Sequence, residues 1–395
     1  MLGANDAEAN PLQPKYQTPD YLRTIPHLRP RIPANALLLR LRSQVIVSLT
    51  RFFNEEGFVQ THTPVITSSD CEGAGEVFTV SSNYSKESPQ KTTPEDKARV
   101  GHFFRSPKYL TVSAQLHLEA LAQAVGKVWT LSPTFRAEKS DTPRHLSEFY
   151  MLEAEMCFAQ DMEDVMSFVE KMLRTAATDL QSSRLGREVL QARGSSQHDG
   201  VSDPDRSASS SVLEQRWGGM AAKAWPRITY HEAIELLAKA ASTRQATFAS
   251  TPSYSEGLQA EHERYVASTV GQGKPVFVTD YPRAQKPFYM APSLSTANSK
   301  GTKGTAACFD LLIPDLCELA GGSMREHQLE QLERTMQAKG VSGGNLEWYK
   351  DLRKYGSVPH GGFGLGFDRL LCYLGGVESV RDVVAFPRWY GRCDC

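Results

Sequence analysis

The sequence predicts an α+β fold in which helices flank an antiparallel β-sheet. Helical and strand patterns are mixed along the 395 residues, without the regular strand–helix alternation that is typical of a parallel sheet. Hydrophobic residues make up 40% of the chain and charged residues 23%, which supports a large core and excludes a disordered protein. The chain also lacks an internal repeat of fixed period, which excludes a solenoid.

The N-terminal half contains the clearest helix. Residues 1–34 are rich in proline and are expected to form an irregular segment or linker. From 35 to 56, hydrophobic residues recur at helical spacing, and Gly57 follows as a natural stop. Further elements are expected as strands at 58–61 and 109–113, a helix at 114–125, strands at 128–132 and 149–155, and a helix at 161–180.

In the C-terminal half, Thr229 and Glu232 form a Thr-x-x-Glu capping box that predicts the start of a helix. The patterns then predict strands at 276–278, 307–312 and 317–321, a helix at 346–355, and a glycine-rich segment at 361–367 before an apolar helix. Polar stretches near 81–97, 194–211 and 293–305 are expected to be insertions that do not pack. Residues 35–395 are therefore expected to be one domain with insertions.

Charge and cysteine content exclude several classes of protein. Lys and Arg number 44 and Asp and Glu 45, so bulk positive charge does not hold nucleic acid, although a local patch can. The cysteine count of seven is odd, and Cys393 and Cys395 lack the second pair of a zinc site, which favours reduced thiols. Residues 1–13 make a poor mitochondrial transit peptide, and no stretch approaches the roughly 18 apolar residues of a membrane span. A cytoplasmic protein without a membrane partner is expected.

The strongest candidate site is the charged segment between the strands at 128–132 and 149–155. Such a run of charges is ordinarily a solvated surface. A functional interpretation requires Arg136 and Arg144 to bind phosphate, which suits the planar, bidentate guanidinium group. It also requires the Phe149 ring to stack on a base.

Two further patterns carry chemistry. The glycine-rich segment at 361–370 fits neither the dinucleotide fingerprint nor the P-loop, so it is interpreted as a glycine-lined strand before a helix that carries Arg369. Asp310 and Glu318 are either two surface acids or ligands on neighbouring strands for Mg²⁺, which takes one or two carboxylates plus substrate phosphates.

Taken together and in order, these segments resemble the class II aminoacyl-tRNA synthetases, specifically the asparaginyl type of the aspartyl/asparaginyl branch. Segments 135–155 and 361–370 resemble the second and third class motifs. Segment 63–76 resembles the end of the first motif and the loop after it. Further matches lie at 111–116, 318–323 and 381–388, and the resemblance extends from about residue 15 to the C-terminus.

The resemblance implies a class II catalytic fold that activates an amino acid with ATP to form an aminoacyl-adenylate. Catalysis then rests on positioning and on neutralisation of phosphate charge. For ATP, it implies Arg136 at the α-phosphate, Glu138 and Phe149 at the adenine, Arg144 and Arg369 at the γ-phosphate with His145 nearby, Gly366 beside the nucleotide, and Asp310 and Glu318 as ligands of Mg²⁺.

For the amino acid, the resemblance implies that Glu72 and Gln115 receive the ammonium group with Ser113 close by, and that Arg325 reaches the side-chain carbonyl. Aspartyl enzymes carry a lysine in Gln-Leu-x-Lys that pairs with the substrate carboxylate. This chain has Leu118 at that position, and leucine cannot pair a buried carboxylate. Asparagine is therefore the expected substrate.

One departure from the family leaves two functions open. The full-length family has an N-terminal OB-fold barrel that reads the anticodon, whereas this resemblance begins near Tyr16. Either the chain is a truncated form, or it is a paralogue without anticodon recognition. It is then an asparagine–tRNA ligase, or a tRNA-independent ligase that passes activated asparagine or aspartate to ammonia, an amine or another small molecule.

A non-catalytic regulatory homologue is less expected than either enzyme, because the chain has Arg136, Glu138, Glu318 and Arg369. The resemblance also implies a homodimer, with the helix expected at 35–56 at the interface.

Overall fold

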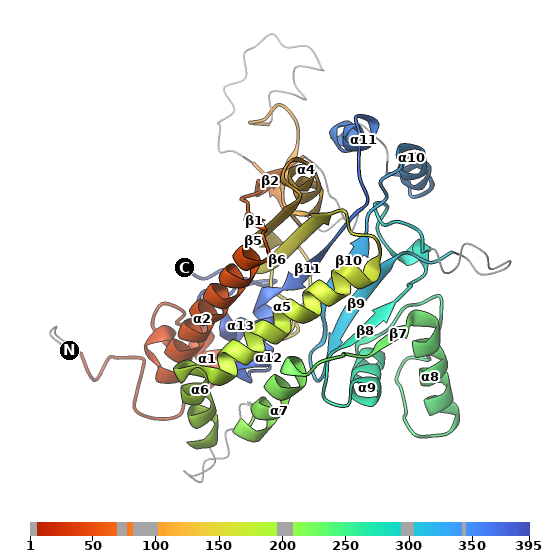
Figure 1. The fold of residues 1–395 in the computed structure, drawn as a ribbon. Coiled ribbons are helices and arrows are strands. Elements are labelled where there is room, and N and C mark those ends of the chain that lie inside the picture. Colours follow the sequence, from red (N-terminus) through yellow and green to blue (C-terminus); the bar gives the residue numbers. More distant parts are fainter. Residues whose placement is uncertain (1–5, 69–76, 82–101, 196–207, 294–303, 342–344) are drawn as a thin grey trace, which may run out of the picture.

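An eight-stranded sheet forms the centre of the structure, a computed structural model that describes residues 6–68, 77–81, 102–195, 208–293, 304–341 and 345–395 (Figure 1). The strands run in the order β1-β5-β6-β11-β10-β9-β8-β7. Their bounds are β1 Val59–Gln60, β5 Lys127–Phe135, β6 Glu148–Cys157, β7 Arg227–Thr229, β8 Val276–Thr279, β9 Cys308–Ile313, β10 Cys317–Met324 and β11 His360–Gly366. A separate antiparallel sheet has the order β2-β4-β3, with β2 Ile66–Thr67, β3 Thr79–Val80 and β4 Lys108–Leu110.

The expected antiparallel sheet is confirmed for the inner strands, which pair antiparallel from β5 to β8. The two edges differ, because β1 pairs parallel with β5 and β7 pairs parallel with β8. Parallel neighbours need a crossover connection, and helices lie between the two strands of each pair along the chain. Helices α8 and α9 connect β7 to β8, whereas the connection from β1 to β5 contains the three strands of the second sheet as well as α4.

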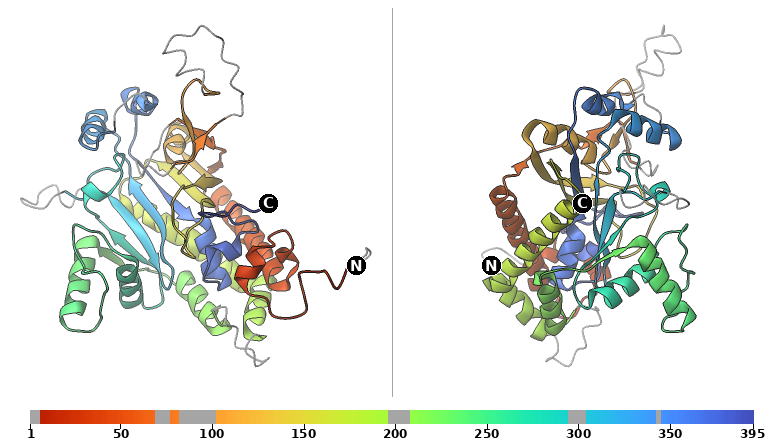
Figure 2. Two further views of the ribbon diagram at one scale, coloured as in Figure 1. Left: turned by 180° about the vertical axis from the view of Figure 1, so that it is seen from behind. Right: turned by 45° about the vertical axis from the view of Figure 1, so that its right-hand side comes forward.

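Helices surround this sheet. Their bounds are α1 Pro19–Arg23, α2 Pro33–Glu55, α4 Gln115–Val125, α5 Met162–Ser182, α6 Arg184–Ser195, α7 Ser210–Ala221, α8 Tyr230–Ser242, α9 Ala260–Gly271, α10 Leu329–Ala338, α11 Glu347–Lys354, α12 Phe367–Gly375 and α13 Val380–Val383, with 3₁₀ turns η1 Arg29–Arg31 and η2 Arg283–Gln285. Thr229 and Glu232 form the capping box of α8, as expected. Helices α10 and α11 lie at the same end of the molecule as α4, opposite α6 and α7 (Figures 1 and 2).

The alternation of side chains along β6 and β11 separates a core face from a site face. On the core face, Leu152 and Phe363 are buried, and the Phe363 ring lies 6.2 Å from Phe168 of α5. On the other face, Gly362, Gly364 and Gly366 of β11 lie opposite Glu155, Glu153 and Met151 of β6. Helix α5 therefore covers one side of the central strands, and the long polar side chains of β6 project from the other side.

The proline-rich N-terminal segment is more ordered than expected. Thr18 caps α1, and Pro19 occupies the first helical position, where its missing N–H costs nothing. Arg23 forms an ion pair with Asp382 at 2.7 Å, and the Arg29 guanidinium donates to a main-chain carbonyl 2.7 Å away in α13. This segment is thereby fastened to the C-terminal region.

The three expected insertions lie largely outside the described residues. Their described ends belong to ordered elements, which differs from the expectation for 194–211. Gly194 lies in α6, and the Ser209 side chain caps α7. The main-chain N–H of Ser293 donates to the carbonyl of Thr305 at 2.9 Å, so the two ends of that stretch meet. The serine-rich composition did not predict this helix cap, because serine is favoured both in loops and at helix N-termini.

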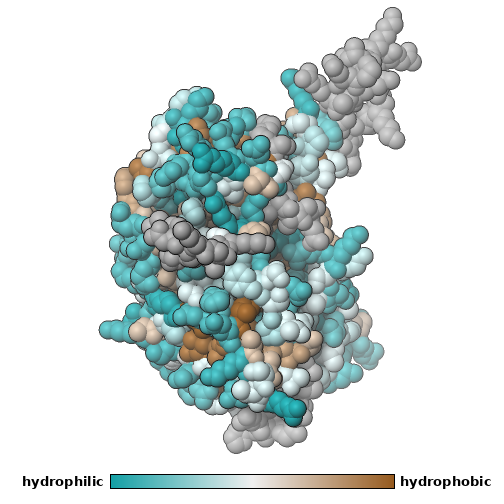
Figure 3. Space-filling view, turned by 90° about the vertical axis from the view of Figure 1, so that its right-hand side faces the viewer, coloured by the Kyte–Doolittle hydropathy of each residue, from teal (hydrophilic) through white to brown (hydrophobic). Residues whose placement is uncertain are grey.

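The surface on the side of α8 is mainly hydrophilic, with a limited hydrophobic area (Figure 3). Among the described residues, no helix combines the length and the hydrophobicity needed to cross a bilayer. The cysteines of the described part are free thiols, and Cys393 and Cys395 are exposed, as expected for tail thiols.

Candidate active site

A cavity opens on the site face of β6, β10 and β11, where the loop between β5 and β6 meets the start of α12. It is named here the arginine cavity, after Arg136, Arg144 and Arg369. All eight residues expected to bind ATP line it: Arg136, Glu138, Arg144, His145, Phe149, Glu318, Gly366 and Arg369. The structure thus brings these eight residues together from three separate stretches of sequence.

One wall of the arginine cavity combines a ring and a cation. The guanidinium carbon of Arg136 lies 5.6 Å from the centre of the Phe149 ring, within the range of a cation–π contact. The hairpin register sets this geometry, because Phe149 pairs with Thr134 near the end of β5 and the main-chain N–H of Arg136 donates to Ser147 at 3.0 Å. A flat base and a phosphate can therefore be bound side by side.

His145 lies at the rim of the cavity with its Nε2 atom 3.5 Å from Glu138 Oε2. Its Nδ1 atom lies 2.5 Å from the Thr142 hydroxyl. Partial burial is the main cause that lowers the pKa of His145; Glu138 opposes it, and the positive charges of Arg369 and Arg144 add to it. The imidazole is therefore held mainly neutral near pH 7.

The other wall carries two cations placed by main-chain carbonyls. Arg144 donates to the carbonyl of Leu316 at 2.6 Å, and Arg369 donates to the carbonyl of Glu318 at 2.9 Å. The carboxylate of Glu318 lies 4.0 Å from Arg369. Bonds to neutral carbonyls orient the guanidinium groups without cancelling their charge, so this wall suits an anionic ligand.

The two expected Mg²⁺ ligands lie together beside Gly321. A Cβ atom on Gly321 would sit 3.3 Å from Asp310 Oδ1 and 3.7 Å from Glu318 Oε1, so the glycine leaves a space between the carboxylates. Glu263 of α9 is a third carboxylate nearby, and burial together with Glu318 and Asp310 raises its pKa to about 7. These crowded acids fit a divalent cation chemically.

Asp310 nevertheless differs from the expectation in one respect. It is absent from the lining of the arginine cavity, and its two carboxylate oxygens lie 2.8 and 3.0 Å from Lys286 Nζ. The Lys286 ammonium also lies 3.8 Å from the centre of the Tyr281 ring. Lys286 and Glu263 could not be predicted from the sequence, because neither stands in a motif and only the tertiary fold brings them to Asp310.

The residues expected to hold the amino acid adjoin the cavity, apart from Glu72, which is outside the described residues. The Ser113 hydroxyl donates to Glu153 at 2.5 Å, and Arg325 donates to the Gln115 amide oxygen at 2.5 Å. Gly364 joins the two regions, since it lines the arginine cavity and lies opposite Glu153 on β6. Ser113 is thus linked through Glu153 to a residue of the cavity lining, whereas Gln115 and Arg325 are buried and absent from that lining.

Arg325 is bound to a carboxylate inside the protein. Its Nε atom lies 3.2 Å from both oxygens of Glu155, and its Nη2 atom lies 3.0 Å from Oε2. The side chains of Arg325 and Glu155 are 2% and 0% exposed. A Cβ atom on Gly362 would lie 2.0 Å from Glu155 Oε2, so only glycine on β11 leaves room for this pair.

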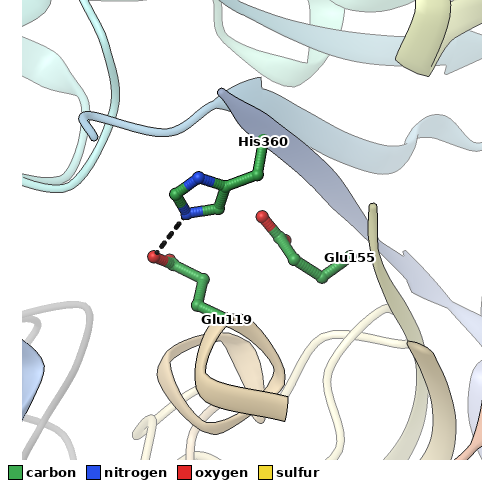
Figure 4. Close-up of side chains that lie close together, drawn as sticks. All are labelled: Glu119, Glu155 and His360. Atoms are coloured by element: carbon green, nitrogen blue, oxygen red, sulfur yellow. Dashed lines mark hydrogen bonds and ion pairs between the residues drawn. The ribbon is translucent and has the colours of Figure 1, made fainter. Parts of the chain in front are cut away.

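A buried group behind this pair was not anticipated from the sequence. Glu119, Glu155 and His360 present ligand atoms within 4.8 Å of one another (Figure 4). Such a triad can bind a metal, but Arg325 already pairs with Glu155 and Arg353 pairs with Glu119 at 2.5 Å. Two guanidinium charges balance the two carboxylates, so these residues form an ion-pair network that does not need a metal.

Comparison with known proteins places the chain beside the tRNA synthetases. Residues 20–390 match the family described as tRNA synthetases class II (D, K and N). The chain is 43% identical to the mitochondrial asparagine–tRNA ligase of Saccharomyces cerevisiae over 386 residues, covering 97% of this chain and 74% of the relative. It is 42% identical to the asparagine–tRNA ligase of Desulfotalea psychrophila, covering 100% of this chain and 79% of the relative.

Solved structures agree with the sequence relatives. The asparaginyl-tRNA synthetase of Pyrococcus horikoshii, complexed with asparaginyl-adenylate, superposes with a TM-score of 0.76 at 28% identity, covering 95% of this chain and 74% of that one. The Entamoeba histolytica enzyme in complex with asparaginyl-adenylate gives a TM-score of 0.76 at 25% identity, covering 100% and 76%.

Proposed function

Because the chain belongs to the class II tRNA synthetases of the D, K and N family, we propose that it activates asparagine with ATP and transfers the asparaginyl group to tRNA. Two features carry this proposal. The charge of Arg325 is balanced by an ion pair with Glu155, and the nearby cavity is lined by the eight residues expected to bind ATP. The relatives are named as asparagine–tRNA ligases, which favours tRNA over a small-molecule acceptor.

On the ATP side, the Phe149 ring stacks on the adenine and Arg136 binds the α-phosphate. Arg144 and Arg369 bind the far end of the triphosphate from the opposite wall. No general base is required, because the carboxylate of the amino acid is itself the nucleophile. The arginines neutralise the negative charge that develops on phosphorus-bound oxygens, and the cavity holds the two reactants in line.

Glu318 is the carboxylate best placed to hold Mg²⁺, because it lines the cavity and faces Asp310 across Gly321. When bound there, Mg²⁺ would neutralise phosphate charge. Lys286 holds Asp310 in place and neutralises part of its charge, so Asp310 contributes more weakly than Glu318.

On the amino-acid side, the paired Arg325 favours a neutral side chain. The guanidinium of Arg325 donates to the ligand carbonyl, while Glu155 neutralises the charge that would attract a carboxylate. Leu118 is 1% exposed and packs in a small hydrophobic cluster, so this position adds no cation. A buried aspartate carboxylate would lack a full counter-charge, which costs several kcal/mol by typical magnitudes for buried ions.

We also propose a homodimer with α2 at the interface. Leu39 and Val47 of this helix are hydrophobic yet 37% and 60% exposed, so they lie on the side that does not pack on the core. A monomeric mass by light scattering at micromolar protein would contradict this proposal. The cytoplasmic location stays a prediction from the sequence.

Pyrophosphate exchange tests the activation step. With ATP and Mg²⁺, exchange should depend on asparagine and be much slower with aspartate. Adding tRNA should then release AMP and place labelled asparagine on the RNA. Faster exchange with aspartate would refute the substrate assignment. Label that reaches ammonia or an amine without RNA would instead identify a tRNA-independent ligase.

A further inference from the structure

The residues around Arg325 belong to a larger buried set, named here the glutamate network. It consists of Gln115 and Glu119 from α4, Glu155 from β6, Arg325 after β10, Tyr349 and Arg353 from α11, and His360 from β11. The motifs account for Gln115 and Arg325, but Glu119, Tyr349, Arg353 and His360 have no role in the reaction described so far. They are 0–6% exposed by residue, and none of them lines the arginine cavity.

Glu119 is the centre of this network. One of its carboxylate oxygens accepts hydrogen bonds from the Tyr349 hydroxyl at 2.7 Å and from Arg353 at 2.5 Å, and lies 3.2 Å from His360 Nε2. The other oxygen accepts from the Gln115 amide at 3.0 Å. Figure 4 shows Glu119 and His360 pointing toward each other from α4 and β11, with Glu155 beside them.

Glu119 controls how the Gln115 amide is turned. The Gln115 oxygen accepts from Arg325, so the amide nitrogen must face the opposite way. There it donates to Glu119 at 3.0 Å and to Glu155 at 3.1 Å. Two carboxylates therefore fix one amide, and removing the charge of Glu119 loosens the group that orients Arg325.

Glu119 also contributes to the charge around Arg325. Glu155 pairs with Arg325, and Glu119, which pairs with Arg353, also acts electrostatically on Arg325. Loss of one buried negative charge makes the electrostatic potential around Arg325 more positive. A more positive Arg325 binds a ligand carboxylate better than the native group does.

From these contacts we propose that Glu119, held by Arg353, Tyr349 and His360, is a positioning residue that turns Gln115 and sets the charge of Arg325, and thereby selects asparagine over aspartate. This inference rests on the proposed asparagine activation. It assigns the selection to a residue that does not touch the ligand, one helical turn beyond Gln115.

The test compares Glu119→Gln with Glu170→Gln in pyrophosphate exchange. Glu170 is a matched control, since it is a buried glutamate on α5 that pairs with Arg227 at 2.8 Å on the opposite side of the sheet. For E119Q, the KM for asparagine should rise about tenfold and the asparagine-to-aspartate ratio of kcat/KM should fall about tenfold or more. The KM for ATP should stay within about twofold, because the arginine cavity is unchanged.

A second variant, Tyr349→Phe, keeps the proposal testable if E119Q does not fold. It removes one hydrogen bond to Glu119 and keeps the ring that packs on Arg353. Its discrimination should fall in the same direction by about two- to fivefold. The inference is overturned if folded E119Q discriminates as E170Q does, or, should E119Q not fold, if Y349F discriminates as the wild type does. Wild-type protein that does not exchange with asparagine would overturn the proposed function as well, which separates the two failures.

Discussion

The arginine cavity and the glutamate network hold similar charged groups under different conditions. In the cavity, the side chains of Arg136, Arg369 and Glu318 are 33%, 32% and 45% exposed. In the network, those of Glu119 and Arg353 are 0% exposed. Partly hydrated charges can exchange water for a ligand phosphate, whereas fully buried charges must be paired within the protein. The cavity therefore supplies charge to the substrate, and the network supplies rigid geometry.

The largest expected effect concerns the stability of the network. Arg353→Met leaves Glu119 as a buried charge without its guanidinium partner, so the free energy of unfolding should fall by about 3–5 kcal/mol. Urea denaturation measures this change. The exposed pair between Arg334 and Glu330 provides the control, and Arg334→Ala should have no measurable effect. Equal stability of the two variants would remove the distinction between the two regions.

The cavity should respond in catalysis and not in stability. Arg136→Ala removes a preorganised donor to the phosphate, and kcat should fall about 10²–10³-fold while the melting temperature changes little. Pyrophosphate exchange and thermal denaturation on the same preparation separate these outcomes. A loss below tenfold in folded protein would show that Arg136 does not act on the transition state.

Within the cavity, the adenine wall should act on binding alone. Phe149→Ala removes the stacking surface, which is worth about 1–3 kcal/mol for a base on an aromatic ring, or roughly 5- to 150-fold in the KM for ATP. The KM for asparagine should be nearly unchanged, because Phe149 does not contact Arg325 in the described network. A parallel rise in both KM values would indicate collapse of the β5–β6 hairpin instead.

The smallest expected effect concerns the pH dependence of stability, to which His360 and His145 contribute in opposite directions. Burial alone would lower the pKa of His360, but the hydrogen bond and charge of Glu119 outweigh burial and raise it, whereas the pKa of His145 is lowered. Stability contributed by His360 is therefore fully present below its ordinary pKa of about 6.5 and is lost as the pH rises through its raised value. His145 has the opposite effect on stability. Its pKa is lowered by folding, so the unfolded chain takes up the proton first as the pH falls below about 6.5, and stability is lost. NMR titration, assigned with His360→Gln and His145→Gln, should place the two resonances on opposite sides of 6.5.

Local sequence predicted the cavity better than the network. Most residues that line the cavity stand in two short motifs at 135–155 and 361–370, where residue type and spacing carry the signal. The contact between Glu119 and His360 joins residues 241 positions apart, and no local pattern marks either one. Tyr349 and Arg353 were visible only as part of an expected helix, whose buried polar face differs little in sequence from a solvated one.

The same limit explains the fold errors. Short hydrophobic runs located inner strands such as β8 and β9. The edge strands β1 and β7 span Val59–Gln60 and Arg227–Thr229, too short for a pattern to indicate their parallel pairing. In the stretch 194–211, Gly194 lies at the end of α6 and Ser209 caps α7, and both residue types are common in loops as well as at helix ends.

The central position of β11 has a consequence for synthesis of the chain. This strand separates β6, which ends at Cys157, from β10, yet it begins only at His360. Until the ribosome delivers it, the halves β1-β5-β6 and β10-β9-β8-β7 each present an unpaired edge at the future site. At typical elongation rates of roughly 5–20 residues per second, β6 waits on the order of 10–40 s for its neighbour. Premature termination before His360 is therefore expected to yield a chaperone-dependent, aggregation-prone product without partial activity.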